Sequence, residues 1–191
     1  MIHRIKDIIA ASIDVKAAIL GDERLLTVIQ DVADECIHAY KRKNKVLFCG
    51  NGGSAADAQH LAAELCGRFY KDRPALFAEA LHVNTSYITA VSNDYSFDEV
   101  YSRMLRGKGV QGDILFGIST SGNSKNVLNA FDTARNMEII TVGMTGFNGG
   151  ELKNRSDFLI NVPSENTPRI QEAHILIGHI ICEFIESALF A

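Results

Sequence analysis

The sequence predicts an α/β fold in which helices cover a parallel sheet, and two observations indicate it. Short apolar runs closed by glycine or polar residues alternate along the chain with longer segments of helical periodicity, and strands that alternate with helices form parallel sheets. A strand, a polar turn and a helix also follow one another twice, at residues 46–66 and 113–136. Because no linker composition interrupts the chain, residues 1–191 are expected to form one domain.

The first 43 residues are predicted to form two helices. Apolar residues recur at steps of three and four over residues 2–20, where Gly21 stops the pattern, and again after Asp22 as far as about residue 43. Both apolar stripes need a partner, which either the sheet or another subunit can supply.

The first strand and the helix after it are predicted at residues 46–49 and 55–66. The apolar run 46–49 is closed by glycines, which is typical of a strand buried on both faces. We expect Ser54 to cap the helix and Gly67 to end it. Residues 70–83 are predicted to be a loop with a short strand at its end.

The second half of the chain repeats this alternation. Residues 85–92 fit either a helix or an extended segment, and Asn93 and Asp94 are predicted to form a turn. The remaining elements are predicted as helices at 97–105, 126–136 and 169–190, and strands at 113–118, 138–144 and 158–162. The last helix is apolar around most of its circumference, so it must be buried on several sides, and we expect a homo-oligomer core there.

The composition and both ends of the chain narrow the function classes. Of the 191 residues, 47% are hydrophobic and 22% are charged, as is usual for globular proteins. A net charge of −4 leaves no basic field for nucleic acid. Charges within residues 1–18 argue against a signal peptide, and polar residues within 175–191 argue against a membrane span. We therefore expect a cytoplasmic protein with no membrane partner, and buried, reduced thiols at Cys36, Cys49, Cys66 and Cys182.

Two polar turns are candidate ligand sites. The turn Gly50-x-Gly52-x-x-Ala55 matches the dinucleotide fingerprint formally, but no strand with an acidic residue follows at the required distance, which disfavours a nicotinamide enzyme. Neither turn ends in the G-K-[ST] of a P-loop. The hydroxyl and amide side chains of residues 119–124 can instead bind a phosphate monoester at a helix N-terminus. The alternative is that Ser121 or Asn123 only caps that helix.

The first turn suits the rest of such a ligand. Gly52 and Gly53 allow a close backbone approach, and Asn51 can bind hydroxyl groups of the ligand. Ligands of open α/β sheets bind at the carboxyl ends of the strands, where both turns are predicted to lie.

His60 and Glu64 form a candidate reactive pair. Residues four apart share a helix face, and the H-x-x-x-E spacing is half of a metal site; the alternative is two polar residues on a helix surface. Gln171 and His179 lie roughly 80° apart around the last helix and can share a face. His174 lies about 140° from His179 and is expected to be structural. We therefore expect His60 and His179 to belong to the same reactive site.

Four motifs together resemble the sugar isomerase (SIS) domain family, and within it the isomerases of seven-carbon sugar phosphates. They are CGNGGSAADAQHLAAEL, AVSND, GISTSGNSKNV and RIQEAHILIGHI, in this order over nearly the whole chain. The resemblance implies one SIS domain, a three-layer α/β/α sandwich of the flavodoxin or Rossmann kind with helical ends. Residues 1–43 would pack in a homotetramer, residues 45–163 would form the core, and residues 168–190 would form the last helix.

The resemblance also implies an activity and a set of site residues. The activity is conversion of D-sedoheptulose 7-phosphate to D-glycero-D-manno-heptose 7-phosphate through an enediol, the first step towards bacterial ADP-heptoses. Glu64 would be the base and His179 the acid, and one zinc ion per subunit would be held by His60, Glu64, Gln171 and His179. The substrate would contact Asn51, Gly52, Gly53, Glu64, Asn93, Asp94, Ser119, Thr120, Ser121, Ser124 and Gln171.

Sites of this family combine residues from neighbouring subunits, so we expect a neighbour to bring the last helix close to His60. Zinc can polarise the carbonyl or fix the geometry, and a carboxylate that binds zinc tightly is a poorer base. Other readings are a non-enzymatic SIS protein, either a sugar-phosphate sensor or a tetrameric partner of the replication initiator, and the same chemistry on another ketose phosphate. The combination of the 60/64 and 171/179 pairs favours the enzyme, because a binding module needs no acid–base pair.

Overall fold

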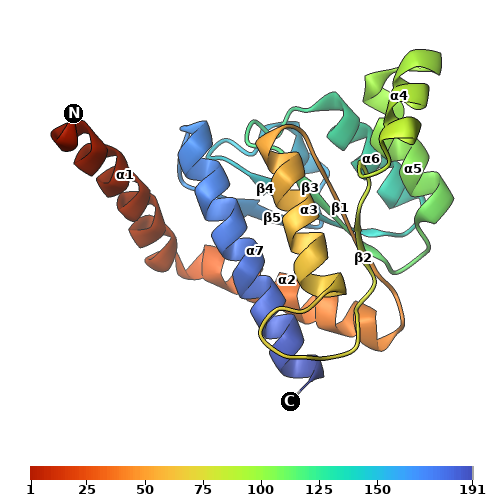
Figure 1. The fold of residues 1–191 in the computed structure, drawn as a ribbon, viewed down its shortest axis with the longest axis horizontal. Helices are drawn as coiled ribbons and strands as arrows, with labels where there is room; N and C mark the ends of the chain where they lie inside the picture. Colours follow the sequence, from red (N-terminus) through yellow and green to blue (C-terminus); the bar gives the residue numbers. More distant parts are fainter. Residues whose placement is uncertain (191) are drawn as a thin grey trace.

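The computed structural model describes residues 1–190, and within that range five strands form one parallel sheet (Figure 1). The strand order is β2-β1-β3-β4-β5, and each neighbouring pair is parallel. The strands are β1 Val46–Gly50, β2 Ala78–Ala80, β3 Ile114–Ile118, β4 Ile140–Thr145 and β5 Phe158–Asn161. The predicted parallel α/β fold is confirmed, and β2 is the short strand expected at the end of residues 70–83.

Helices cover both faces of the sheet and make the expected three layers. On one face the core joins α2, α3 and α7 to Val46 and Phe48 of β1; on the other it joins α4, α5 and α6 to Leu47 and Cys49. This alternation follows from the two-residue period of a strand. The helices are α1 Ile2–Leu20, α2 Glu23–Lys41, α3 Gly53–Cys66, α4 Thr85–Asp94, α5 Val100–Lys108, α6 Lys125–Asn136 and α7 Thr167–Leu189, with the 3-10 turns η1 Phe97–Glu99 and η2 Gly150–Asn154.

The helix α3 begins two residues earlier than predicted, at Gly53 instead of residue 55. Gly52 occupies the N-cap with φ of +58°, a left-handed conformation that favours glycine. The chain therefore turns into the helix at Gly52, before Ser54, which lies inside the helix and is buried. The prediction that Ser54 caps α3 is wrong for this reason, whereas the end of α3 at Gly67 is confirmed.

Other local predictions are corrected in a similar way. Residues 85–92 are helical, and Asn93 and Asp94 complete α4 where a turn was predicted. The strand predicted from residue 138 begins only at Ile140, because Glu138 adopts a φ of +55° that is incompatible with a strand. Among the cysteines, Cys66 is exposed, contrary to expectation, while the other three are buried.

The first helix stands away from the body of the molecule (Figure 1). It is attached to α7 by two contacts: Arg169 Nη1 donates to the Ile8 carbonyl at 2.8 Å, and Ser12 Oγ donates to Glu172 at 2.6 Å. Its exposed large apolar side chains are Ile2, Ile5, Ile8, Ile9, Ile13 and Leu20. None of the helices in residues 1–190 combines the length and apolar content that a membrane crossing requires.

Candidate active site

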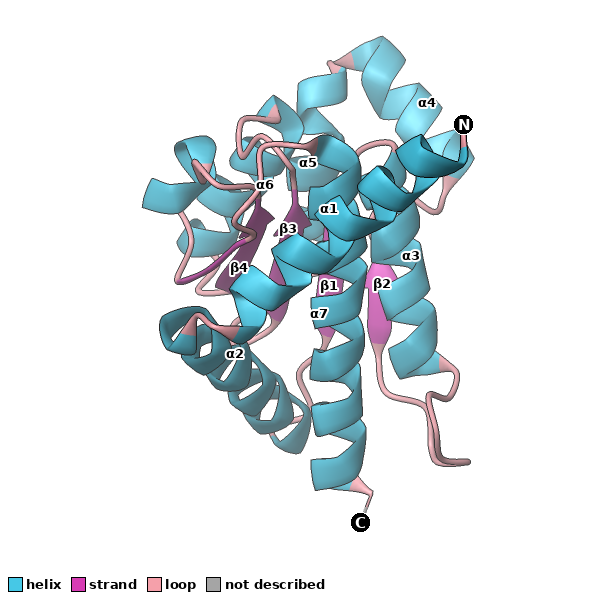
Figure 2. Ribbon diagram, turned by 90° about the vertical axis from the view of Figure 1, so that its left-hand side faces the viewer, coloured by secondary structure: helices cyan, strands magenta, loops and turns pink. Residues whose placement is uncertain are grey.

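The helices α3 and α7 run side by side over one face of the sheet, and both views show them as neighbours (Figures 1 and 2). They pack closely at Gly178, where an added Cβ would lie 2.5 Å from Cδ2 of Leu61. The glycine therefore allows a helix contact that a larger residue would prevent. Since His60 precedes Leu61 and His179 follows Gly178, this contact brings the two histidines together.

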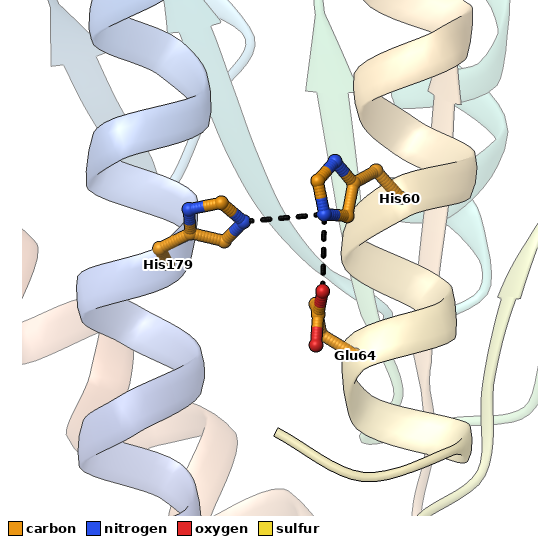
Figure 3. Close-up of side chains that lie close together, drawn as sticks. All are labelled: His60, Glu64 and His179. Carbon is orange, nitrogen blue, oxygen red and sulfur yellow. Dashed lines mark hydrogen bonds and ion pairs between the residues drawn. The ribbon is translucent and has the colours of Figure 1, made fainter. Parts of the chain in front are cut away.

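His60, Glu64 and His179 form a cluster in the gap between these helices (Figure 3). Nε2 of His60 lies 3.0 Å from Oε1 of Glu64 and 3.4 Å from Nε2 of His179. The candidate ligand atoms of all three side chains lie within 4.8 Å of one another. The predicted link between residues 60 and 179 is thus present within a single chain. This corrects the expectation that a neighbouring subunit must bring the last helix to His60.

The donor set of the cluster fits a zinc ion. Two imidazole nitrogens and one carboxylate oxygen are found in catalytic zinc sites, which leave a position for water or substrate. Burial, together with the nearby His60, lowers the pKa of His179, and the charge of Glu64 opposes this shift only in part. The lowered pKa favours the neutral form of His179, which can bind a metal or accept a proton.

Gln171 lies at a different level of the same helix face. An added Cβ on Gly53 would lie 2.7 Å from Nε2 of Gln171, so the amide packs against the start of α3. The rise from Gln171 to His179 is roughly 12 Å. Because α3 and α7 run in the same direction, Gln171 faces the turn and His179 faces His60. The structure thus brings three of the four predicted zinc ligands together and places the fourth beside the candidate sugar turn.

The turn after β1 is fixed by two residues that the sequence analysis did not identify. Asn51 and Asn126 exchange a pair of amide hydrogen bonds, each 2.9 Å long. The hydroxyl of Tyr101 donates to the Gly50 carbonyl. Asn126 is 2% exposed. Its position in the first turn of α6, directly after the second candidate turn, is the sequence feature that could have identified it. The Asn51 amide is thus oriented before any ligand binds.

The second turn, residues 119–124, lies beside the first because β1 and β3 are neighbours and Gly50 pairs with Ile118. The hydroxyls of Ser119 and Ser124 lie 3.0 Å apart. Ser124 occupies the N-cap of α6, and the described chain shows no side-chain capping bond there. Capping by Ser121 or Asn123 is therefore not observed. The turn borders a pocket of about 470 Å³ lined by Thr120, Ser121, Asn123, Phe147, Asn148, Gly150, Ser164, Glu165, Thr167 and Ile170.

The other candidate residues lie apart from this cluster. Asn93 donates to Asp94 at 2.9 Å on the exposed end of α4, which packs against the opposite face of the sheet. His174 is fully buried, with Nε2 3.1 Å from the Thr145 carbonyl oxygen. Burial lowers the pKa of His174 to about 4. The expectation that His174 is structural agrees with this position.

Comparison with known proteins gives consistent matches. The sequence model of the SIS domain matches residues 11–146. The chain is 52% identical to phosphoheptose isomerase of Aneurinibacillus thermoaerophilus, over 97% of this chain and 94% of the relative. It is 53% identical to phosphoheptose isomerase 2 of Campylobacter jejuni, over 97% of this chain and 92% of the relative.

Two solved structures share the fold over almost their full length. Phosphoheptose isomerase GmhA from Neisseria gonorrhoeae superposes with a TM-score of 0.91 at 41% identity, and a phosphoheptose isomerase from Francisella tularensis with a TM-score of 0.93 at 35% identity. In both comparisons the match covers 97% of this chain and 98% of the other.

Proposed function

The chain belongs to the SIS domain family, and we propose that it converts D-sedoheptulose 7-phosphate to D-glycero-D-manno-heptose 7-phosphate, the first step towards ADP-heptoses. It is an isomerase, like the relatives with which it shares 52% and 53% sequence identity. The observation that carries the proposal is the His60–Glu64–His179 cluster. It lies between α7 and α3, the helix into which the turn after β1 leads. We also propose that residues 1–191, of which Ala191 lies outside the described range, act as one SIS domain.

The two turns provide a place for each end of the substrate. The N-terminus of α6 and the hydroxyl groups around it would hold the phosphate. The rise along α3 from Gly53 to His60 is roughly 10 Å, comparable with the span of an extended seven-carbon chain. The proposed phosphate contacts are Ser119, Thr120, Ser121 and Ser124, and the proposed sugar contacts are Asn51, Gly52, Gly53, Glu64 and Gln171. Asn93 and Asp94 lie on the opposite face of the sheet, so we propose that a neighbouring copy supplies these two sugar contacts.

Isomerisation needs one group that removes a proton and one that donates a proton. We propose that Glu64 takes the proton from C1 while His179 protonates the carbonyl oxygen on C2, which gives the enediol. Glu64 then returns its proton to C2, and His179 accepts the proton of the C1 hydroxyl to form the aldehyde. The lowered pKa of His179 makes its protonated form a strong donor and its neutral form available for the second step.

A zinc ion, when bound by His60, Glu64 and His179, would supply Lewis acidity that polarises the substrate carbonyl. The role proposed for Gln171 is contact with the sugar, and a share in the zinc site would require the glutamine of another copy. This follows from the separation of Gln171 and His179 along α7.

We further propose a cytoplasmic homotetramer in which neighbouring copies complete the sites. The exposed isoleucines of α1 and the exposed Leu176 and Phe184 of α7 support an association of copies, since water contact of so many large apolar side chains is unfavourable. The cytoplasm is where a phosphorylated sugar substrate is available. Light scattering of the purified chain would give the mass that tests the tetramer.

One assay tests the proposed reaction directly. The purified protein is incubated with sedoheptulose 7-phosphate, with a chelator or with added zinc, and the aldoheptose phosphate is measured. We expect product with zinc, less with the chelator, and none with Glu64→Gln. A stable protein that forms no product would refute the enzyme and favour a sugar-phosphate sensor or a protein-binding tetramer. Product formation by Glu64→Gln at the wild-type rate would refute only the role of Glu64 as the base, and not the proposed reaction.

A further inference from the structure

A buried ion pair outside the proposed reaction joins the two helices that carry the cluster. Nε of Arg73, in the irregular segment between α3 and β2, lies 2.9 Å from Oε2 of Glu186, near the end of α7. The two side chains are 2% and 1% exposed. Buried charges are costly unless additional hydrogen bonds satisfy them, so the other contacts of this pair indicate what it does.

The carboxylate of Glu186 binds the backbone of the loop that follows α3. It accepts hydrogen bonds from the N–H groups of Phe69, Tyr70 and Lys71 at 3.2, 2.8 and 2.9 Å. Burial alone raises the pKa of Glu186, but these bonds and the one from Arg73 outweigh it, so the pKa lies below its ordinary value. Glu186 therefore remains ionised and fastens residues 69–71 to α7.

The guanidinium of Arg73 binds the end of α3. Nη2 donates to the carbonyl of Glu64 at 2.9 Å, and Nη1 donates to the carbonyl of Leu65 at 2.8 Å. Both carbonyls belong to the last turn of α3, where helix geometry leaves carbonyl groups without an intrahelical partner. A cation is also favourable at this end of a helix. Arg73 thus links the backbone of Glu64 to α7 through Glu186.

This link lies next to the cluster. Glu186 follows His179 by seven residues, about two turns, so both lie on the face of α7 turned towards α3. The loop that Glu186 holds also places the ring of Phe69 with its centroid 5.7 Å from that of His179. The Gly178–Leu61 contact lies at the level of the cluster, and the Arg73–Glu186 pair lies further towards the C-terminal ends of both helices.

We propose that Arg73 and Glu186 are positioning residues that set the spacing of α3 and α7, and so hold Glu64 and His179 at the distance needed for zinc binding and for proton transfer. The inference rests on the proposed function for its catalytic part. Its structural part concerns the shared site of His60, Glu64 and His179 and can be measured without substrate. Neither residue of the pair contacts the substrate or the reacting atoms in this arrangement.

Two variants test the role of the pair. Arg73→Lys keeps the positive charge but replaces a planar group of several donors with a single ammonium that cannot serve Glu186 and both carbonyls. Glu186→Gln keeps the shape but removes the charge. Zinc affinity of each folded protein is measured by competition with a chromogenic chelator, without sugar. We expect the zinc dissociation constant to rise about 10- to 100-fold, as for other groups that orient metal ligands, and kcat to fall with little change in KM.

The control is Arg155→Lys, which alters a partly exposed pair with Asp132 on another part of the surface. It should leave zinc affinity unchanged. The folded fraction of every variant is measured by near-ultraviolet circular dichroism under the same conditions. Wild-type zinc affinity in both variants would overturn the proposal. A loss of zinc binding no larger than the loss of folded protein would also overturn it, as would a wild-type chain that binds no zinc. An inactive wild-type chain whose zinc affinity depends on Arg73 would instead refute the proposed reaction and leave the positioning role standing.

Discussion

Replacing Gly178 with alanine should damage the site more than it damages the fold. The new Cβ would lie 2.5 and 2.6 Å from the two terminal methyl groups of Leu61, whereas favourable contacts between carbon atoms need about 3.5 Å. Leu61 is 2% exposed, and the cavity that it borders has a volume of only about 10 Å³, so its side chain has little free space to enter. The two helices must therefore separate by about 1 Å at the level of His60 and His179.

The effects on stability and on function differ in size. Overpacking costs about 1 to 3 kcal/mol, and the better helix propensity of alanine returns about 1 kcal/mol. The net loss in the free energy of unfolding should therefore be about 0 to 2 kcal/mol. A misplacement of about 1 Å at a reacting group can lower the rate about 100-fold, and metal distances tolerate only about 0.2 Å. We expect kcat and zinc affinity to fall strongly in a protein that remains folded.

Urea unfolding, zinc competition and the isomerase assay measure these quantities on the same samples. Gly107→Ala is the matched control, because Gly107 lies in α5 with open space where its Cβ would be. It should be neutral or slightly stabilising and fully active. Adding Leu61→Val, which removes both clashing methyl groups, should restore zinc affinity to Gly178→Ala. Unchanged zinc affinity and activity in Gly178→Ala would show that the helix spacing does not control the cluster.

Two further predictions concern buried polar groups. The pKa of His174 is lowered from 6.5 to about 4, so the unfolded chain binds the proton more readily and stability is lost as pH falls through this range. His174 alone should remove about 3 kcal/mol from the free energy of unfolding by pH 4. Urea titrations of His174→Gln should lack that part of the pH dependence. Asn126→Ala removes the partner of Asn51 and should lower the free energy of unfolding by about 1 to 3 kcal/mol. It should also raise KM in steady-state kinetics, because the freed amide of Asn51 no longer has a fixed orientation; unchanged KM would contradict a role of Asn51 at the substrate.

Local patterns predicted much of this structure because they report local physics. The buried strands β1 and β3 are continuous apolar runs, and the shared face of His60 and Glu64 follows from their spacing on one helix. Helical periodicity likewise located α2 and α7. In each case the forces that determine the element act between residues close in sequence, so a single chain carries the information.

The remaining features depend on distances along the chain that no local pattern encodes. Arg73 and Glu186 are separated by 113 residues, and the segment that contains Arg73 has the composition of an ordinary loop. Which part of α3 faces Gln171 and which part faces His179 depends on the parallel course of α3 and α7, which the amino-acid order does not state. Ser54 was misassigned because the left-handed Gly52 precedes a residue type that usually caps helices.

The parallel course of α3 and α7 has an electrostatic consequence for the whole molecule. Three helices, α3, α6 and α7, direct their N-termini towards the carboxyl edge of the sheet, so their peptide dipoles add at one end of the protein. In a chain with a net charge of −4, these N-termini would favour the proposed phosphate ester at that edge. Because these dipoles are fixed by the backbone, the attraction requires no lysine or arginine and is present before the ligand arrives.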